Sequence, residues 1–447
     1  MTLDVFLSRL MDDARDAGIE AAEAYIASGD SFKAVSVQQE IVQYAVNTTC
    51  GLSLRGLYRG KMGYASTEVM DEEAVGQLVQ GVLESASLSE EEDKQFIYAG
   101  DEKYPEVETY NPALEAVLPK EKLDFVLNME KAALNTDPHV RQVKHNTILS
   151  GSGQVRIKNS YGLDISYKGN YCCAYLQPIA REGDKANTAF DIALSHDFAK
   201  LDYQALAESA VKKAVFGLAG KSVRSGTYRV ILKNDAMADL METFSGIFSA
   251  ENTQHGLSLL KGRVGETIAA DCMTLMDDPL LPFGNGSRPF DAEGVATKTK
   301  AVIEGGKLKT LLHNLKTAEK DGVQTTGNAS KAGYSAPVRV SPTNFFIKPG
   351  ADDLETLMKK MGDGLVITEL SGLHSGANGV SGDFSLLAKG FSVKEGKKGD
   401  PVEQITIAGN FYQLLQNVRA VGSDLKFPGG NVGSPSIDAG EMAVAGN

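Results

Sequence analysis

The amino-acid sequence predicts an α+β protein, and three observations support this class. The spacing of apolar residues is helical at the start of the chain and changes to a period of two from about residue 31. Helical runs and hairpin-like runs are segregated along the chain. Glycine-rich turns separate short strand patterns in the last half. We therefore expect an α/β N-terminal region with hairpins and helices, followed by a large C-terminal domain rich in antiparallel strands.

The first element is predicted as one amphipathic helix over residues 3–27. Its apolar residues recur three and four positions apart: Leu3, Phe6, Leu7, Leu10, Met11 and Ala14. Alternating residues from Ser31 to Tyr58 then predict antiparallel strands and hairpins. A second helix is expected over about 71–86.

Two loop-rich stretches predict the division of the chain. The acidic run Ser89-Glu-Glu-Glu-Asp and three spaced prolines mark a boundary within 90–119, and Gly217–Gly226 marks a second. Between them we expect a helix over 120–135, strands over 140–179 and a helix over 202–217. The predicted units are residues 1–110, 111–222 and 223–447.

The last unit begins with a strand at Thr227–Lys233, followed by a helix with Asn234 or Asp235 as its N-cap. Beyond that helix the sequence alternates strands and turns such as Gly305-Gly306. Residues 301–317 and 391–418 share a strand-turn-strand-helix order that is too weak to assert as a repeat. Cys272 is expected as a small buried thiol in an alternating strand. The glycine-rich loop from Phe283 to Arg288 precedes no clear helix, so we expect a flexible rim rather than a phosphate site.

The segment beginning at Asn234 carries the most specific pattern, because it ends in Gly256, Ser258, Gly262 and Gly265. It resembles the core motif of the TldD/PmbA family, in which His-Glu-x-x-x-His is followed by a Glu and by Gly-x-Ser-x-x-x-Gly-x-x-Gly. Aligned on these glycines, Met241 and Gly246 occupy the two histidine positions and Glu242 keeps the glutamate. Zinc needs imidazole, thiolate or carboxylate ligands. Glycine supplies none, and a thioether is a soft donor unsuited to a hydrolytic dication.

Further motifs extend the resemblance over nearly the whole chain. They are Gly51-Leu-Ser-Leu-Arg-Gly, Asp291-Ala-Glu-Gly-Val-Ala-Thr, Thr326-Gly-Asn-Ala, Thr343-Asn-Phe-Phe-Ile-Lys-Pro-Gly and the run from Leu370 to Leu386. The Cys-Gly-Lys segment that supplies a further ligand in TldD-type subunits is missing, and neither cysteine nor histidine occurs after residue 374. This absence of three expected ligands resembles the pattern of the PmbA (TldE) branch. That branch is the subunit that pairs with the metal-bearing one.

The resemblance implies a cleft, and the residues expected to line it or to bind substrate come from these motifs. They are Glu242, Glu251, His255, Asp291, Glu293, Asn328, Asn344, His374, Asn378 and Asp383. No catalytic residue and no metal ligand is predicted in this chain. Zinc is expected in the partner subunit.

Bulk composition excludes several other classes. The 447 residues carry a formal net charge of -13 without a cluster of basic residues, which argues against nucleic-acid binding. The N-terminus lacks the apolar core of an export signal, and no apolar run is long enough to span a membrane. The four cysteines show no C-x-x-C spacing. A cytoplasmic protein with reduced thiols is therefore expected.

These observations favour a metal-free subunit of a TldD/TldE-type heteromeric metallopeptidase that processes or degrades unfolded and leader peptides. Its expected partners are a TldD-type subunit and the peptide. One alternative is a self-sufficient metallopeptidase that rebuilds a metal site from His255, His374 and a carboxylate. Another is a non-enzymatic homodimer that binds extended peptides by strand addition.

Overall fold

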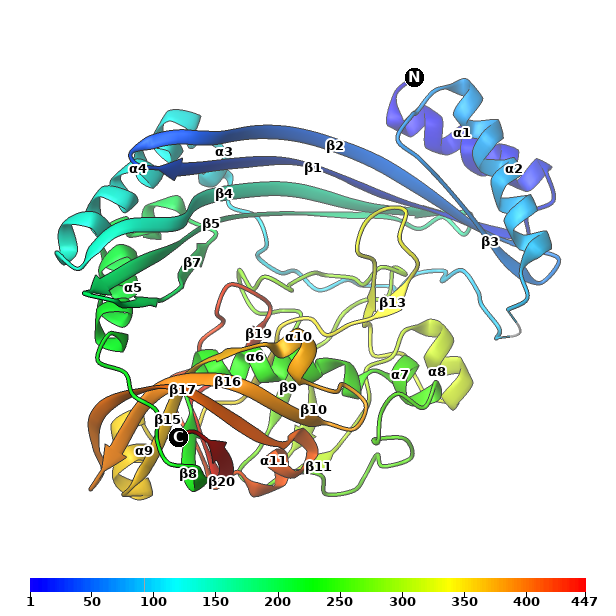
Figure 1. The fold of residues 1–447 in the computed structure, drawn as a ribbon. Coiled ribbons are helices and arrows are strands. Elements are labelled where there is room, and N and C mark those ends of the chain that lie inside the picture. The colour runs from blue at the N-terminus through cyan, green and yellow to red at the C-terminus, as the bar shows by residue number, and fades with distance from the viewer. Residues whose placement is uncertain (92) are drawn as a thin grey trace.

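The computed structural model describes residues 1–91 and 93–447. A long, arched sheet lies above a C-terminal body built of shorter strands and helices (Figure 1). The arch is an antiparallel seven-stranded sheet of order β3-β2-β1-β4-β5-β6, with β7 paired to β5. Its strands are β1 Ala21–Val37, β2 Glu40–Tyr58, β3 Lys61–Thr67, β4 Val140–Asn159, β5 Asp164–Glu182, β6 Lys185–Thr188 and β7 Asp191–Ser195.

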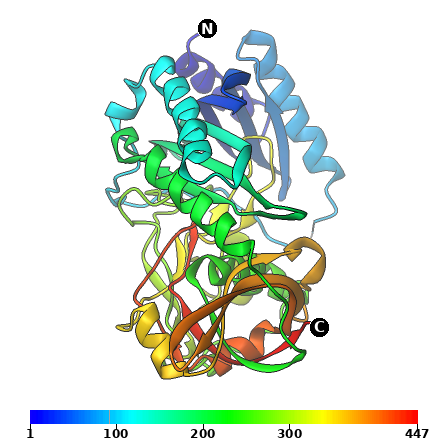
Figure 2. The same cartoon turned by 60° about the vertical axis from the view of Figure 1, so that its left-hand side comes forward.

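Helices cover the two ends of the arch. At one end, α1 (Leu3–Asp16) and α2 (Glu72–Leu88) enclose a core around Phe6, Leu10 and Leu78. At the other end, α4 (Pro119–Thr136) and α5 (Tyr203–Gly217) lie side by side against the sheet (Figure 2). The short elements α3 (Pro112–Glu115) and η1 (Phe198–Lys200) flank that pair.

The C-terminal body contains a six-stranded sheet of order β17-β16-β15-β8-β20-β18, a five-stranded sheet of order β11-β10-β9-β14-β19, and the pair β12-β13. The strands are β8 Gly226–Leu232, β9 Leu275–Asp277, β10 Lys300–Glu304, β11 Lys307–Leu308, β12 Ala329–Ser330, β13 Arg339–Val340, β14 Phe345–Ile347, β15 Gly364–Ser371, β16 Asp383–Lys394, β17 Lys397–Asn410, β18 Ala420–Val421, β19 Val432–Gly433 and β20 Ile437–Ala445. The helices are α6 Asn234–Phe244, η2 Ser245–Phe248, α7 Ala250–Gln254, α8 Leu315–Asp321, α9 Leu354–Met361, α10 Leu373–Gly376 and α11 Phe411–Asn417.

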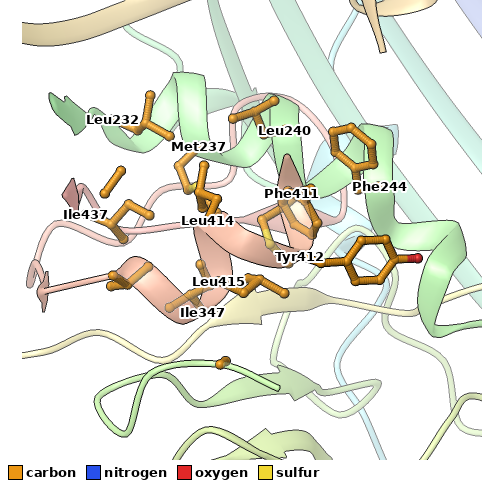
Figure 3. Packing of buried hydrophobic residues seen from close by; sticks show 14 of the residues in the cluster. Leu232, Met237, Leu240, Phe244, Ile347, Phe411, Tyr412, Leu414, Leu415 and Ile437 are labelled. Atoms are coloured by element: carbon orange, nitrogen blue, oxygen red, sulfur yellow. The ribbon is translucent and has the colours of Figure 1, made fainter. Parts of the chain in front are cut away.

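The helices α6 and α11 pack against each other in the core of this body (Figure 3). Phe244 stacks on Phe411 with ring centroids 4.6 Å apart. Both rings are fully buried, as are Met237 and Leu240 on the same face of α6. This core fixes the orientation of the segment that carries the degenerate metal motif.

The predicted α+β class is confirmed, and so are the helices expected over 71–86, 120–135 and 202–217. The single helix over 3–27 is wrong. The helix ends at Asp16, Gly18 adopts a left-handed φ of 83°, and β1 begins at Ala21. Pairing of β1 with both β2 and β4 outweighs the helical propensity of its alanines.

Four predictions about the chain need correction or restriction. Lys233 is the N-cap of α6 and Asn234 is its first helical residue, so neither predicted cap is correct. Cys272 is exposed in a turn closed by Met273 N–H on the Ala270 carbonyl at 2.8 Å, ahead of β9. Glu92 of the acidic run lies outside the described residues. The division near residue 110 stays a prediction. Strands from both sides of it, β1 and β4, pair in one sheet.

Candidate functional site

Met241 lies on the core face of α6. Apolar residues at 237, 240, 241 and 244 form one helical stripe, and the Met241 side chain is fully buried in it. Glu242, one position on, is exposed on the other side of the helix. The position that the first histidine occupies in the family motif is therefore part of the hydrophobic core in this chain.

The second position, Gly246, lies in η2, where the Asn252 amide occupies the adjacent space. Asn252 Nδ2 donates to the Gly246 carbonyl at 2.8 Å, and a Cβ added at Gly246 would lie 3.1 Å from that nitrogen. A buried thioether and a glycine beside an amide do not match the nitrogen, thiolate or carboxylate ligands of zinc. The residues at the motif positions therefore do not fit a zinc ion.

The outer face of α6 is acidic. Asp239 is partly buried there, and desolvation, together with the charges of Asp235, Glu242 and Glu369, raises its pKa to about 7. Lys426 Nζ lies 2.7 Å from Asp235 Oδ1 and offsets part of this charge. The motif alignment did not single out Asp239, because its position has no counterpart among the expected ligands.

This environment predicts a stabilising substitution, Asp239→Asn. A carboxyl group with a raised folded pKa stabilises the fold at low pH and loses that contribution as pH rises through about 7. At pH 8, Asp239→Asn should raise the free energy of unfolding by about 1–2 kcal/mol, after allowance for solvent screening. Near pH 4 the gain should vanish. Thermal melts at both pH values provide the measurement. Asp235→Asn, which breaks the contact with Lys426, should not stabilise, and an equal gain in both variants would contradict the assignment.

The residues proposed for a rebuilt metal site are not brought together. Glu251 accepts from Arg339 Nη1 at 2.8 Å. His255 caps the end of α7 and His374 lies in α10, and both are exposed. Among residues 1–91 and 93–447, no three histidine, cysteine, aspartate or glutamate side chains are grouped so that they could hold a metal ion.

A buried polar framework contains Asn328, one of the predicted cleft residues. Its centre is Asp277, which is fully buried and which the sequence did not reveal. Asp277 Oδ1 accepts from Thr343 N at 2.6 Å and Oγ1 at 2.8 Å. Asp277 Oδ2 accepts from Lys300 Nζ at 2.7 Å and Asn328 Nδ2 at 2.8 Å. Asn328 thus holds the ends of several strands together.

Asp291 and Glu293 are also framework residues. Asp291 accepts three backbone N–H groups, from Glu293 at 2.9 Å, Val295 at 3.1 Å and Ala329 at 3.0 Å. Burial and the nearby Glu293 charge raise the pKa of Asp291, although the N–H donors of Glu293 and Ala329 favour the ionised carboxylate. Glu293 Oε2 accepts from Leu315 N at 2.8 Å, and its Oε1 lies 3.2 Å from Arg55 Nη1 on the arched sheet.

A lysine forms a second link between the C-terminal body and the arch. Lys331 Nζ donates to Ser53 Oγ at 2.7 Å and lies 4.6 Å from the centroid of the Tyr25 ring. Burial, with a smaller contribution from the Arg55 charge, lowers the pKa of Lys331 to about 8. Single charged residues separated this far in sequence have no spacing pattern, so this junction could not be predicted.

The remaining predicted residues organise loops. Asn344 accepts from Gly286 N at 2.8 Å and donates to Ser287 Oγ at 2.8 Å, which closes the loop around 284–287. Asn378 accepts the N–H groups of residues 380 and 381, both at 3.0 Å. Asp383 accepts from Asn410 Nδ2 at 2.8 Å.

A pocket of about 470 Å³ lies between the arch and the C-terminal body. The pocket is lined by residues 194–197 at the end of β7, by Leu281 and residues 283–285, and by Phe427 and Gly430. His196 and Phe283 face each other with ring centroids 5.5 Å apart, and Phe283 has a left-handed φ of 52°. An adjoining space of about 380 Å³ shares His196 and Asn285. Asn344 alone of the predicted cleft residues lines either space, and the glycine-rich loop forms part of the wall.

Comparison with known proteins identifies the family. Sequence models of the PmbA/TldA metallopeptidase domains match three parts of the chain. Domain 1 matches residues 22–86, the central domain matches 112–217 and the C-terminal domain matches 225–446. A crystal structure from Thermotoga maritima, described as a candidate modulator of a DNA gyrase, is 33% identical, has a TM-score of 0.91, and covers 99% of this chain and 100% of its own. The chain belongs to the PmbA/TldD metallopeptidase family.

Relatives of the PmbA type are similar over almost the whole length. The Metalloprotease PmbA homolog of Haemophilus influenzae is 28% identical over 94% of this chain and 90% of its own. Metalloprotease PmbA of Escherichia coli O157:H7 is 26% identical over 96% and 92%. TldE from Thermococcus kodakarensis shares the fold, with a TM-score of 0.88 at 24% identity over 99% and 100%. Within the PmbA/TldD family the chain is of the PmbA (TldE) type. No helix of the described residues is long and apolar enough to cross a membrane.

Proposed function

We propose that this chain is the metal-free subunit of a two-component PmbA/TldD peptidase. It joins a TldD-type subunit that bears the zinc, and the pair acts on unfolded or leader peptides. One observation carries the proposal: the fold of the family is kept over the full length, while Met241 and Gly246 stand where the motif has histidines. Zinc in the partner would activate water for peptide hydrolysis. This chain supplies binding surface and support for the assembled channel.

The buried framework supports this role, because such a subunit must hold its surface loops in fixed positions. Asp277, Asp291 and Asn344 tie strands and loops of the C-terminal body to one another. Glu293 and Lys331 tie that body to the arch. These contacts order the scaffold without placing a nucleophile or a metal-bound water. The four free cysteines are in keeping with our proposal of a cytoplasmic location.

The test uses the chain alone and with a TldD-type subunit that retains His-Glu-x-x-x-His. Bound metal is measured by mass spectrometry and cleavage by release of fragments from an unstructured peptide. We expect cleavage only from the mixture and zinc only in the partner. Glu242→Gln in this chain should leave the rate within about twofold, whereas loss of a true general base costs about 10²–10⁴-fold.

Replacing the first motif histidine of the partner with alanine should abolish activity. Stoichiometric zinc and cleavage in the isolated chain would instead select the self-sufficient peptidase. Peptide binding without cleavage in any mixture would select the non-enzymatic homodimer.

A further inference from the structure

We infer that the pocket between the arch and the C-terminal body binds the C-terminal carboxylate of a peptide. The pocket has a volume of about 470 Å³ and adjoins a second space of about 380 Å³. Leu194, His196, Gly284 and Asn285 line both. Volumes in this range are typical of sites for small organic ligands, which suits the last one or two residues of a peptide. The peptide nature of the ligand rests on the proposed function, whereas its carboxylate follows from the groups around the pocket.

His196 contributes an imidazole ring whose two nitrogens have no protein partner. Nδ1 and Nε2 are both buried and make no hydrogen bond within the described chain. The residue is nevertheless held in place, because Asn111 Nδ2 donates to the His196 carbonyl at 2.8 Å. A buried polar group without a partner destabilises a fold. Since this ring lines both spaces, a ligand with a hydrogen-bond acceptor can satisfy it.

A guanidinium group lies behind the wall of the second space. Arg288 follows Ser287, which lines this space together with Tyr167. Burial raises the pKa of Tyr167 and the charge of Arg288 opposes that shift, so the guanidinium and the phenol lie close together. Arg288 Nε and Nη2 are buried and have no hydrogen-bond partner in the part of the chain that the structure describes. Asp291 is within range of the same charge, but its hydrogen bonds come from backbone N–H groups.

The charges around the pocket favour an anion. Of the described residues that line the two spaces, Asp197 alone has a carboxylate, and it accepts the Ala199 N–H at 3.1 Å. Lys200 also lines the larger space. Because the whole chain carries a net charge of -13, this concentration of cationic groups is a local exception. Guanidinium, ammonium and imidazolium groups donate charge-assisted hydrogen bonds, and a carboxylate accepts several of them at once.

The larger space also has an apolar wall, which suits the side chain next to a terminal carboxylate. Leu281, Phe283 and Phe427 belong to this wall. Phe283 is 38% exposed and has a left-handed φ of 52°, and its N–H donates to the Glu108 carbonyl at 2.8 Å. Such backbone strain persists only where the surrounding contacts impose it, and it is frequent at ligand sites. A free C-terminus with an apolar or aromatic last side chain therefore matches both the charge and the wall.

The test measures peptide binding to the isolated 447-residue chain by fluorescence anisotropy. The probe is an N-terminally labelled pentapeptide of glycine and alanine that ends in phenylalanine. With a free terminal carboxylate it should bind at least about tenfold more tightly than with a terminal amide. A third probe ends in glutamate amide, which moves the carboxylate to a side chain, and it should bind as weakly as the amide. The inference is overturned if either amide probe binds as tightly as the free acid, or if the free acid does not bind at about 1 mM.

Two substitutions locate the site. His196→Phe keeps an aromatic ring without its nitrogens, and Arg288→Met keeps an apolar stem without its charge. Each should weaken binding of the free acid at least about fivefold and leave binding of the amide unchanged. His145→Phe and Arg181→Met are the matched controls, because both residues are exposed and line neither space.

A full preference for the free acid in both pocket variants, with circular dichroism that matches the wild type, overturns the assignment. If a pocket variant fails to fold, the wild-type comparison of acid and amide still decides. Failure here leaves the proposed function untouched, since that is tested by metal content and by cleavage in the mixture.

Discussion

Arg55→Met is expected to lower the free energy of unfolding by about 3–5 kcal/mol, because it removes the guanidinium that pairs with two buried carboxylates. Arg55 Nε donates to Glu23 Oε1 at 2.7 Å, and Arg55 Nη1 donates to Glu293 Oε1 at 3.2 Å. The three side chains are 7%, 1% and 5% exposed. Since Glu23 and Arg55 belong to the arch and Glu293 to the C-terminal body, the substitution should also loosen the contact between them.

The pH dependence of this loss can be stated from Glu23. Burial raises the pKa of Glu23, and Arg55 opposes that shift. Without Arg55 the folded pKa rises further, so the cost of burying the ionised group grows as pH rises. Urea denaturation followed by circular dichroism should therefore show a larger loss at pH 8 than at pH 5. Arg9→Met, which removes an exposed pair with Glu72, should leave the free energy of unfolding nearly unchanged. Equal losses from Arg9→Met and Arg55→Met would contradict this assignment.

Local signals were enough to predict several helices. Asp71 caps α2, Asp202 caps α5 and Pro119 begins α4, and each lies beside an amphipathic run. The stretch after Gly18 was mispredicted because its alanines favour a helix in isolation. Its conformation is decided by two neighbouring strands, one of which lies more than a hundred residues away. Such pairing leaves no trace in local spacing.

The candidate site shows the same limit. The motif positions Met241 and Gly246 could be read from glycine spacing, and the structure adds that Met241 is part of the core. Asp291, Glu293, Asn328 and Asn344 are predicted from the motifs to line a cleft, and Asn344 does line the pocket of about 470 Å³. Their hydrogen bonds show that they hold buried backbone and side-chain groups. The motif resemblance alone does not reveal these contacts, because the hydrogen-bond partners come from segments far apart in the sequence.

Asp277→Ala is the second substitution expected to have a large effect, about 3–5 kcal/mol of lost unfolding free energy. Its carboxylate accepts four hydrogen bonds, from two groups of Thr343, from Lys300 and from Asn328. Alanine leaves the Lys300 ammonium, 9% exposed, without its counter-charge. The neighbouring Asp278→Ala provides the control. Asp278 accepts from Leu280 N and Thr299 Oγ1 at a partly exposed position, so its loss should stay near 1 kcal/mol.

A double-mutant cycle separates the charge from the other hydrogen bonds of Asp277. If the unpaired ammonium dominates, adding Lys300→Met to Asp277→Ala should recover about 1–3 kcal/mol of the loss, because both charges are then absent. If the backbone and amide contacts dominate, the two losses should simply add. Recovery would mean that Asp277 and Lys300 act as one buried unit joining β9 to β10. That unit lies beside Thr343 and Asn328, which belong to two family motifs. This explains why those motifs keep polar residues at positions closed to solvent.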